Sequence, residues 1–398
     1  MASDENVTGE DGVAFRRSDV TLANWRVHPY SAWSFQNVPE LMPVAEITAA
    51  GAPEEPVAEP GLIASLSVHR DDGSEMTALE HLKRTHADRF VMMRDGVVLD
   101  EWLAPHAEAE RPHIVFSVSK SITGMLAGIA IEDGLIDPDA RVTDYVAARR
   151  GSAYGTARVR HLLDMTVSLD FAEDYLDTKG GFARYRRSTL WNPQTSGRHE
   201  TMHDVLASLK PVAGRAHGEV YHYASPDTDM MGLVIQAAVG QRFHAYLAER
   251  LWAAMGARGA AHITVDRIGA ARAAGGICVT ARDLARFGQL VLDGGVTADG
   301  RQLIPARWIA DMRENGDARA WKKGHDKSVF PDGRYRSFWY NVGNERDCFC
   351  AIGLHGQWLW IDPASRIVLT KMSSRPVPSD DALSAAEVRF LGQVARGL

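Results

Sequence analysis

Strand-like patterns lie near both ends of this chain of 398 residues, and helical patterns fill its middle. Two apolar runs, Phe90–Arg94 and Val97–Trp102, flank Asp95-Gly96, a dipeptide typical of a two-residue hairpin turn. Near the other end, Ala351–Trp360 and Ile367–Met372 are rich in strand-forming residues. Strands from both ends that share one sheet indicate an α+β fold, with an antiparallel sheet flanked by helices and a mainly helical lobe inserted.

Apolar residues at helical spacing predict the elements between and after these strands. Thr77 is a possible N-cap of the first helix, because threonine at that position accepts a hydrogen bond from the first turn. The predicted helices cover Glu75–Asp88, Val159–Met165, His203–Leu209, Asp227–Ala238, Phe243–Met255, Ala281–Leu292 and Asp381–Val394. A further helix begins near Ser117 and ends at Asp133-Gly134, because glycine commonly stops a helix.

Residues 1–60 have little regular pattern, and they differ in this from the rest of the chain. Their prolines and glutamates predict an extended strap (Pro53, Glu54, Glu55, Pro56, Glu59 and Pro60). Aromatic residues indicate that part of it packs on the body (Trp25, Tyr30, Trp33 and Phe35). We expect an extension over 1–60 and one main domain over 61–398. Within that domain, an α/β lobe takes about 61–116 and 262–398, and a helical lobe takes about 117–261.

Charge and composition exclude several classes of protein. The net charge is −7 and the pI is about 6.1, so no basic surface is available for nucleic acid or an anionic membrane. The N-terminus lacks the basic and apolar regions of a signal peptide, and no apolar run could span a bilayer. Cys278, Cys348 and Cys350 form neither a disulfide framework nor a zinc site. We expect a cytoplasmic protein without a metal or an organic cofactor.

Ser117 and Lys120 form the first candidate for chemistry. At 3.6 residues per turn, residues three apart share one face of a helix, so the lysine amine lies over the serine hydroxyl. Apolar residues flank the pair on both sides, at Ile114–Phe116 and at Ile122–Leu126. Burial lowers a lysine pKa and lets the amine act as a base toward serine. An ordinary N-cap serine beside a solvated lysine has the same spacing, so that alternative stays open.

Two further segments carry groups that suit the same chemistry. In Tyr221–Asp227, Tyr223 and Ser225 are two residues apart in an extended run and point to one side. A phenol beside a lysine can pass on a proton, although Ser225 or Asp227 could equally cap the next helix. In Ala351–Trp360, glycines suggest a close backbone approach and a free N–H for an oxyanion hole. His355 there is either a base or a packed residue.

Together, Ser-x-x-Lys, then Tyr-x-Ser about a hundred residues later, then a glycine-bearing strand, give the motif order of a known superfamily. The sequence resembles the serine β-lactamase and penicillin-binding superfamily from about Phe90 to Met372. Within it, short segments are similar to the nylon-oligomer hydrolases, which cleave linear amides such as the 6-aminohexanoate dimer. These segments are Glu173–Tyr175, Ile263–Asp266, Leu292–Val296, Phe330–Gly333, Gly343–Arg346 and His355–Gln357.

The resemblance implies a β-lactamase/transpeptidase-like fold for the main domain, and roles for particular residues. Ser117 is then the acylated nucleophile, Lys120 its base and Tyr223 the relay of the proton to the leaving group. The backbone N–H groups of Ser117 and Leu354 hold the oxyanion. Substrate contacts fall to Tyr175, Ser225 and His355.

The sequence also departs from its relatives. Lactam-binding relatives have Lys-Thr-Gly on the last strand, whereas here Ala351-Ile352-Gly353 holds that place without a lysine, which argues against β-lactam turnover. A basic stretch after Tyr175 is either a solvated loop or a pocket rim suited to an anionic substrate (Lys179, Arg184, Arg186 and Arg187).

Three functions stay open at this point. The first is a serine hydrolase for small linear amides. The others are a carboxylesterase of the same fold for short-chain esters, and a non-catalytic binding protein on this scaffold. We expect a small-molecule amide or ester as partner, and a homodimer is possible.

Overall fold

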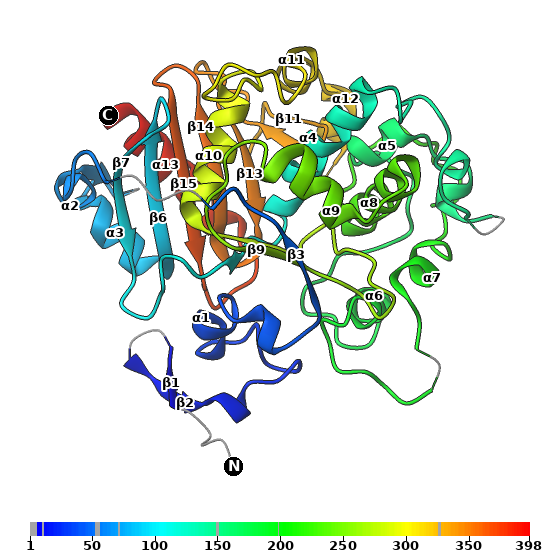
Figure 1. Ribbon diagram of the computed structural model, residues 1–398, viewed down its shortest axis with the longest axis horizontal. Helices are drawn as coiled ribbons and strands as arrows, with labels where there is room; N and C mark the ends of the chain where they lie inside the picture. Colours follow the sequence, from blue (N-terminus) through cyan, green and yellow to red (C-terminus); the bar gives the residue numbers. More distant parts are fainter. Residues whose placement is uncertain are drawn as a thin grey trace.

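The computed structural model describes residues 6–9, 12–51, 56–70, 72–148, 151–197, 199–324 and 328–398. Its main feature is an antiparallel sheet that combines strands from both ends of the chain (Figure 1). In the described residues its seven strands have the spatial order β11 (Arg334–Arg336), β12 (Trp339–Asn341), β13 (Phe349–Gly353), β14 (Gln357–Asp362), β15 (Ile367–Ser373), β6 (Ala87–Arg94) and β7 (Val97–Leu103). The predicted α+β fold with an antiparallel sheet is confirmed.

The predicted hairpin is present as β6 and β7. Both turn residues have positive φ, +50° at Asp95 and +81° at Gly96. This is the conformation that a two-residue hairpin turn requires, and it explains the Asp-Gly dipeptide. The hairpin attaches to the C-terminal strands because β6 pairs antiparallel with β15.

Helices cover both faces of the sheet. Neighbouring residues of β15 point to opposite faces: the Thr370 hydroxyl donates to the Ala281 carbonyl, and the Lys371 amine lies 2.6 Å from Glu387 Oε1. Ala281 begins α10 (Ala281–Leu292), and Glu387 belongs to α13 (Asp381–Gly397). All of β15 is therefore buried, including its polar residues Thr370, Lys371 and Ser373.

The first predicted helix is shorter than expected. α3 covers Ala78–Arg84, and the Thr77 hydroxyl caps it by accepting from Glu80 N at 3.1 Å. Its N-terminal boundary was wrong because β5 (Glu75–Thr77) pairs with β4 (Ser67–His69). The predicted C-terminal end was wrong because the chain enters β6 at Ala87.

The helical part of the chain lies beside the sheet, on the right in Figure 1. α4 is buried from Val118 to Ala130 and contacts both α8 and the sheet strand β13. The predicted helices of this part are present with shifted ends. The predicted helix over 243–255 becomes π-helical after Leu247. The helix α6 was not predicted. The elements are α4 (Val118–Glu132), α5 (Val159–Leu163), α6 (Gly181–Ser188), α7 (Met202–Leu206), α8 (Ser225–Val239), α9 (Phe243–Leu247) and the π-helical η6 (Ala248–Trp252). None of the helices in the described ranges has the length and hydropathy needed to cross a bilayer.

The sequence pattern suggested a single strand over Ala351–Trp360, but the structure has two strands with a turn between them. The chain turns at η8 (Leu354–Gly356) between β13 and β14. His355 at φ +61° and Gly356 at φ +90° make this turn. Gly353 is also required, because a Cβ there would lie 2.5 Å from the Val115 carbonyl oxygen. Glycines that looked like breaks in a strand therefore mark a hairpin that touches the start of α4.

Residues 12–51, the N-terminal segment, contain α1 (Tyr30–Ser34) and β3 (Val44–Ile47), which joins a second, four-stranded sheet with β9 (Ala261–Thr264), β10 (Ile277–Val279) and β8 (His113–Ile114). The part that holds α1 lies below the larger sheet and the helices, and β3 runs upward across the molecule beside β9 (Figure 1). A separate apolar cluster joins Trp25, Trp33 and Phe35 to Phe116 and Trp191. Residues 52–55, with Pro53, Glu54 and Glu55 of the predicted strap, lie outside the described residues, and the division into lobes stays a prediction.

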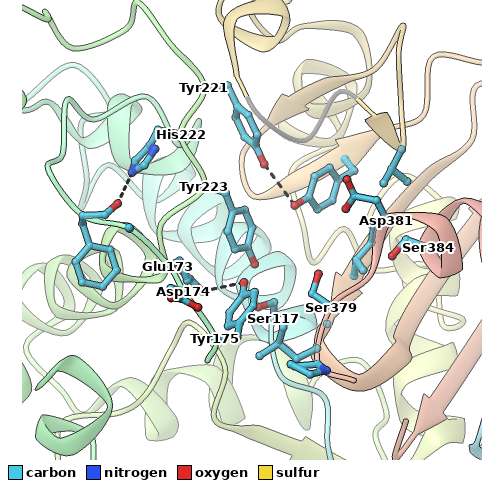
Figure 2. Close-up of a pocket in the computed structure, with 18 of the residues that line it drawn as sticks. Ser117, Glu173, Asp174, Tyr175, Tyr221, His222, Tyr223, Ser379, Asp381 and Ser384 are labelled. Atoms are coloured by element: carbon cyan, nitrogen blue, oxygen red, sulfur yellow. Dashed lines mark hydrogen bonds between the residues drawn. The ribbon is translucent and has the colours of Figure 1, made fainter. Parts of the chain in front are cut away.

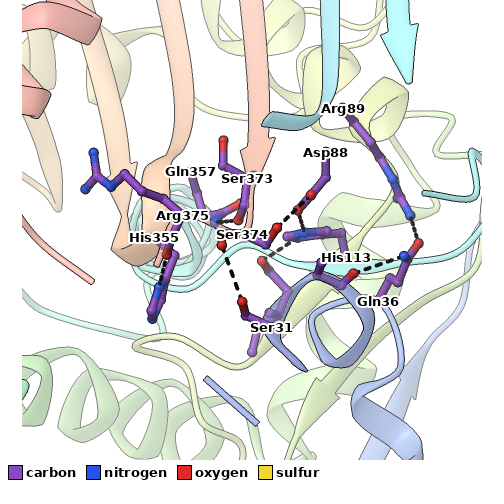
Figure 3. A network of polar contacts seen from close by, with 12 residues as sticks. Ser31, Gln36, Asp88, Arg89, His113, His355, Gln357, Ser373, Ser374 and Arg375 are labelled. Carbon is purple, nitrogen blue, oxygen red and sulfur yellow. Dashed lines mark hydrogen bonds and ion pairs between the residues drawn. The ribbon is translucent and has the colours of Figure 1, made fainter. Parts of the chain in front are cut away.

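Polar contacts add to this apolar cluster (Figure 3). The Ser31 hydroxyl donates to the Ser374 carbonyl at 3.3 Å, and Arg89 donates to Gln36 Oε1 at 3.0 Å. The Ser374 hydroxyl donates in turn to buried Asp88 at 2.8 Å. The N-terminal segment is thus bonded to the sheet next to the loop that follows β15.

The remaining helices are short and lie at the ends of the sheet. They are α2 (Leu62–Ser65), α11 (Ala306–Glu314) and α12 (Ala318–Lys323). Two further strands, β1 (Asn6–Thr8) and β2 (Ala14–Arg16), form a small hairpin near the N-terminus.

Candidate active site

Ser117 lies at a sharp turn between β8 and α4. Phe116, directly before it, has φ +43°, in the left-handed region that a bulky residue rarely occupies. The Phe116 ring is held by Trp25, Phe35 and Trp191, with centroid distances of 6.1, 4.9 and 5.9 Å. Ser117 takes the N-cap position of α4, but its side chain makes no capping bond. The alternative of an ordinary helix-capping serine is therefore wrong.

Lys120 faces Ser117 across one turn of α4. Its Nζ donates to Ser117 Oγ at 2.9 Å, to Ser225 Oγ at 3.0 Å and to the Ala274 carbonyl at 2.7 Å. The side chain is 1% exposed, so the solvated-lysine alternative is also wrong. Burial lowers the pKa of Lys120 from 10.5 to about 7, while Glu173 opposes this shift and Arg272 adds to it. At neutral pH a substantial fraction of this amine is uncharged and can accept a proton.

Tyr223 and Ser225 approach the lysine from the start of α8. The Lys120 Nζ lies 4.9 Å from the centroid of the Tyr223 ring. Ser225 is the first residue of α8, and it bonds to Lys120 instead of capping the helix. Figure 2 shows the hydroxyl end of Tyr223 directed toward Ser117. The structure thus brings together the four side chains that the sequence singled out from two distant segments: Ser117, Lys120, Tyr223 and Ser225.

Glu173 organises one side of this group. Its carboxylate accepts bonds from Ser225 Oγ at 2.7 Å, from Ser225 N at 2.6 Å and from the Tyr175 hydroxyl at 3.2 Å. Tyr175, a predicted substrate contact, is therefore held beside Ser225. Sequence reasoning missed the part played by Glu173, although it lies only two residues from Tyr175 in the same short segment.

Two cavities meet at Ser117. The first has a volume of about 650 Å³ and is lined by Tyr223, Phe330 and Tyr340 among others (Figure 2). The second has a volume of about 460 Å³ and is lined by Phe116, Trp191 and Ser225 among others. Ser117, Glu173, Tyr175 and Leu354 line both cavities. A substrate that reaches Ser117 can therefore extend in two directions.

Leu354 follows β13 directly and lines both cavities together with Ser117. The Ser117 N–H precedes the first residue of α4, where helix N–H groups have no partner within the helix and favour negative charge. This arrangement is compatible with the predicted oxyanion hole, whose assignment to the two N–H groups stays a prediction.

His355 belongs to the packing rather than to proton transfer. Its ring is 2% exposed, lies 5.0 Å from Phe35 and 5.5 Å from Phe116, and donates from Nδ1 to the Arg375 carbonyl at 2.7 Å (Figure 3). Burial lowers the pKa of His355 to about 3. Such a ring accepts a proton poorly at neutral pH, which argues against a role as a base. Because His355 also lines the second cavity, its predicted contact with substrate stays open.

The basic stretch after Tyr175 divides between solvent and cavity. Lys179 is exposed, and Arg184 is paired with Glu200 at 2.6 Å. Arg186 is buried and lines the second cavity together with Arg26 and Arg272. No local signal marked Arg26 or Arg272, because neither is part of a recognisable motif. Solvent exposure is thus correct for Lys179 and a cavity position for Arg186, and contact with an anionic substrate stays a prediction.

Comparisons with known proteins identify the family and the fold. A family model described as Beta-lactamase matches residues 85–393. A 6-aminohexanoate-dimer hydrolase from Paenarthrobacter ureafaciens is 34% identical over 381 residues, which cover 95% of this chain and 94% of that relative. A solved structure from Bacillus anthracis, provisionally named a 6-aminohexanoate-dimer hydrolase, has a TM-score of 0.85 at 24% identity and covers 96% of this chain and 97% of its own. A family VIII carboxylesterase has a TM-score of 0.59 at 16% identity, with coverages of 81% and 95%.

Proposed function

The chain belongs to the beta-lactamase family and is a hydrolase of the serine beta-lactamase fold, and we propose that it cleaves small linear amides through an acyl-enzyme on Ser117. One observation carries the proposal: a buried amine with a pKa of about 7 lies 2.9 Å from the Ser117 hydroxyl. The choice of amides follows the name of the relative from Paenarthrobacter ureafaciens.

Acylation begins at Ser117. Uncharged Lys120 takes the hydroxyl proton while Ser117 Oγ attacks the carbonyl carbon of the amide. The oxygen of the tetrahedral intermediate gains negative charge, and the N–H groups of Ser117 and Leu354 stabilise it. Preorganised donors of this kind each lower the activation barrier by about 3 kcal/mol in acyl-transfer enzymes.

The leaving amine then needs a proton, and Tyr223 supplies it. The C–N bond breaks, the phenol proton passes to nitrogen, and Lys120 returns its proton to Tyr223. Water later attacks the acyl carbon while Lys120 takes its proton. The bond from that carbon to Ser117 Oγ then breaks, Lys120 returns the proton to Oγ, and the acid is released. We expect Tyr223→Phe to lower kcat/KM for anilides more than for p-nitrophenyl esters, because a good leaving group needs less protonation. Equal losses on both substrates would contradict the relay.

The central test uses purified protein with Ser117→Ala as the blank. We expect hydrolysis of small linear amides, such as the anilides above, by the native protein, none by the variant, and a covalent mass increase on Ser117 with a fluorophosphonate probe. Lys120→Ala should lose most of the activity as well, because the variant lacks the amine that accepts the Ser117 proton. A Lys120→Ala protein with nearly full activity would exclude the assigned base.

The same panel separates the alternatives. A carboxylesterase should cleave p-nitrophenyl esters and leave the linear amide intact. A non-catalytic binding protein should cleave neither, and its Ser117 should not react with the probe. Intact Ser117, Lys120 and Tyr223 argue against the second of these alternatives.

A further inference from the structure

Among the described residues, three arginines and one carboxylate, Glu173, line the second cavity. Arg26, Arg186 and Arg272 all line it. Arg272 is paired with buried Asp229. Within the described residues, neither Arg26 nor Arg186 forms an ion pair with a carboxylate. Two guanidinium groups therefore line the same cavity without a directly paired carboxylate, although the charges of Asp174 and Asp177 oppose the lowering of the Arg186 pKa by burial.

Neutral groups hold Arg26 in place. Its guanidinium carbon lies 4.8 Å from the centroid of the Trp25 ring, and its amino groups donate to the Trp191 carbonyl at 3.3 Å and to Asn192 Oδ1 at 2.7 Å. Burial lowers the pKa of Arg26 to about 9, and the charges of Arg186 and Arg272 contribute to this. The cluster is thus electrostatically unfavourable when the cavity is empty, and a bound anion would relieve it.

Arg186 is fixed in a similar way. It donates to the backbone carbonyls of Tyr175, at 3.1 Å, and Asp177. Its Nε, like the Nε of Arg272, is buried without a hydrogen-bond partner in the described chain. Planar guanidinium groups with unused donors are well suited to bind a carboxylate, whose oxygens accept such bonds.

The other walls of the cavity are largely apolar, and they suit a hydrocarbon chain. They include Leu22, Val27, Phe182, Trp191 and Pro193. A ligand that fits this cavity therefore combines a hydrocarbon spacer with an anionic end.

The position of Tyr223 indicates which half of the substrate binds in the second cavity. Tyr223, the proposed donor to the leaving group, lines the first cavity and not the second. The leaving amine then occupies the first cavity, and the acyl half occupies the second. We propose that the acyl half carries a terminal carboxylate bound by Arg26 and Arg186, so that the substrates are monoamides or monoesters of dicarboxylic acids; this rests on the proposed function.

Part of this subsite comes from outside the region that defines the family. The family model begins at residue 85, whereas Leu22, Arg26 and Val27 belong to the N-terminal segment. Specificity for an anionic acyl group therefore depends in part on residues outside the region that the family model matches.

The test compares three amides of similar length. Adipic acid mono-p-nitroanilide has a carboxylate on the acyl half, its methyl ester has none, and 6-(hexanoylamino)hexanoate has one on the leaving half. We expect native kcat/KM for the acid to exceed that for its methyl ester at least about tenfold, as a charged hydrogen bond allows. Arg26→Met should reduce this ratio about tenfold, and Arg26→Lys should reduce it less, because the charge remains.

Arg187→Met is the matched control, because Arg187 lies on the same helix as Arg186 but does not line the cavity. It should leave the acid-to-ester ratio unchanged. Equal rates on acid and methyl ester would overturn the subsite, and a preference for the carboxylate on the leaving half would overturn the assigned orientation.

Binding separates failure of the subsite from failure of the hydrolase. In Ser117→Ala protein, calorimetry with methyl hydrogen adipate measures the subsite without turnover, and dimethyl adipate is the neutral control. If no amide or ester is cleaved but the monoanion binds and Arg26→Met weakens that binding about tenfold, the proposed function fails and the anion subsite stands. Cleavage of neutral substrates without preferential binding of the monoanion would reject the subsite alone.

Discussion

At the level of single residues, the site depends on the protonation state of Lys120. Its charged amine donates to Ser117, Ser225 and the Ala274 carbonyl. When it is uncharged, two donors remain for Ser225 and Ala274, and its lone pair can accept the Ser117 proton. Burial brings its pKa to about 7, close to the value at which a general base works best at neutral pH.

This pKa predicts the pH dependence of catalysis. A base must be unprotonated, so kcat/KM should fall as pH decreases through about 7 and level off above about 8. The measurement is a pH profile of kcat/KM for a neutral amide between pH 5 and pH 9. A rate that is independent of pH over that range would contradict a lysine base with a lowered pKa.

Glu173 should tune that profile without touching the reacting atoms. Its negative charge raises the pKa of Lys120 relative to burial alone, so Glu173→Gln should shift the pH profile toward lower pH. Glutamine keeps an acceptor for Ser225, which limits structural damage. Glu200→Gln is a control, because that carboxylate pairs with Arg184 away from Lys120. A purely structural role for Glu173 would lower the rate and leave the apparent pKa unchanged.

At the level of elements, the site depends on how closely α4 packs against α11 and the segment that precedes β12. Trp308 Nε1 donates to the Gly124 carbonyl at 3.1 Å, and a Cβ on Gly124 would lie only 2.2 Å from the Ser337 carbonyl oxygen. A Cβ on Gly128 would likewise meet the Trp308 ring at 2.4 Å. The two glycines therefore allow α4 to lie close to the backbone at Ser337 and to the Trp308 ring.

We expect Gly124→Ala to lower the free energy of unfolding by about 1–3 kcal/mol, because the backbone of 337 must move to admit a methyl group. Urea denaturation followed by circular dichroism measures this change. Gly392→Ala in α13 is the matched control, since a Cβ there meets only the Arg396 side chain, at 3.4 Å. Alanine is a better helix former than glycine, so the control should be neutral or stabilising. A neutral result for Gly124→Ala would show that α4 has room to shift.

At the level of the whole molecule, the N-terminal segment connects folding to function. Trp25 is fully buried, donates from Nε1 to the Trp191 carbonyl at 3.0 Å and stacks on Phe116 at 6.1 Å. Phe116 in turn precedes Ser117 with a strained backbone. The segment therefore supports the nucleophile from behind as well as lining the second cavity.

Trp25→Ala should lower the free energy of unfolding by about 3–5 kcal/mol, the usual cost of truncating a buried tryptophan. It should also lower kcat at temperatures where the protein remains folded, because Phe116 loses its support. Thermal unfolding and single-temperature kinetics measure the two effects separately. Val13→Ala, at a position that is 44% exposed, should change neither. Full activity in folded Trp25→Ala protein would show that the N-terminal segment does not support Ser117.

The sequence alone determined the features that depend on neighbours along the chain. The spacing of Ser117 and Lys120 predicted that they face each other, and their apolar neighbours predicted the burial of the lysine. Asp95-Gly96 predicted the hairpin, and the returning strands predicted the mixed fold. Tyr223 joined this group only through resemblance, because no local rule connects residues a hundred positions apart.

Tertiary structure alone decided what surrounds that group. Glu173 beside Ser225, the turn at His355 and the entry of Arg26 into the second cavity all arise when distant segments pack together. Helix and strand patterns reflect local hydrogen bonding and one buried face, so they carry little information about which far segment covers that face. A cavity wall is the joint product of several such contacts, and its charge becomes visible only when they are assembled.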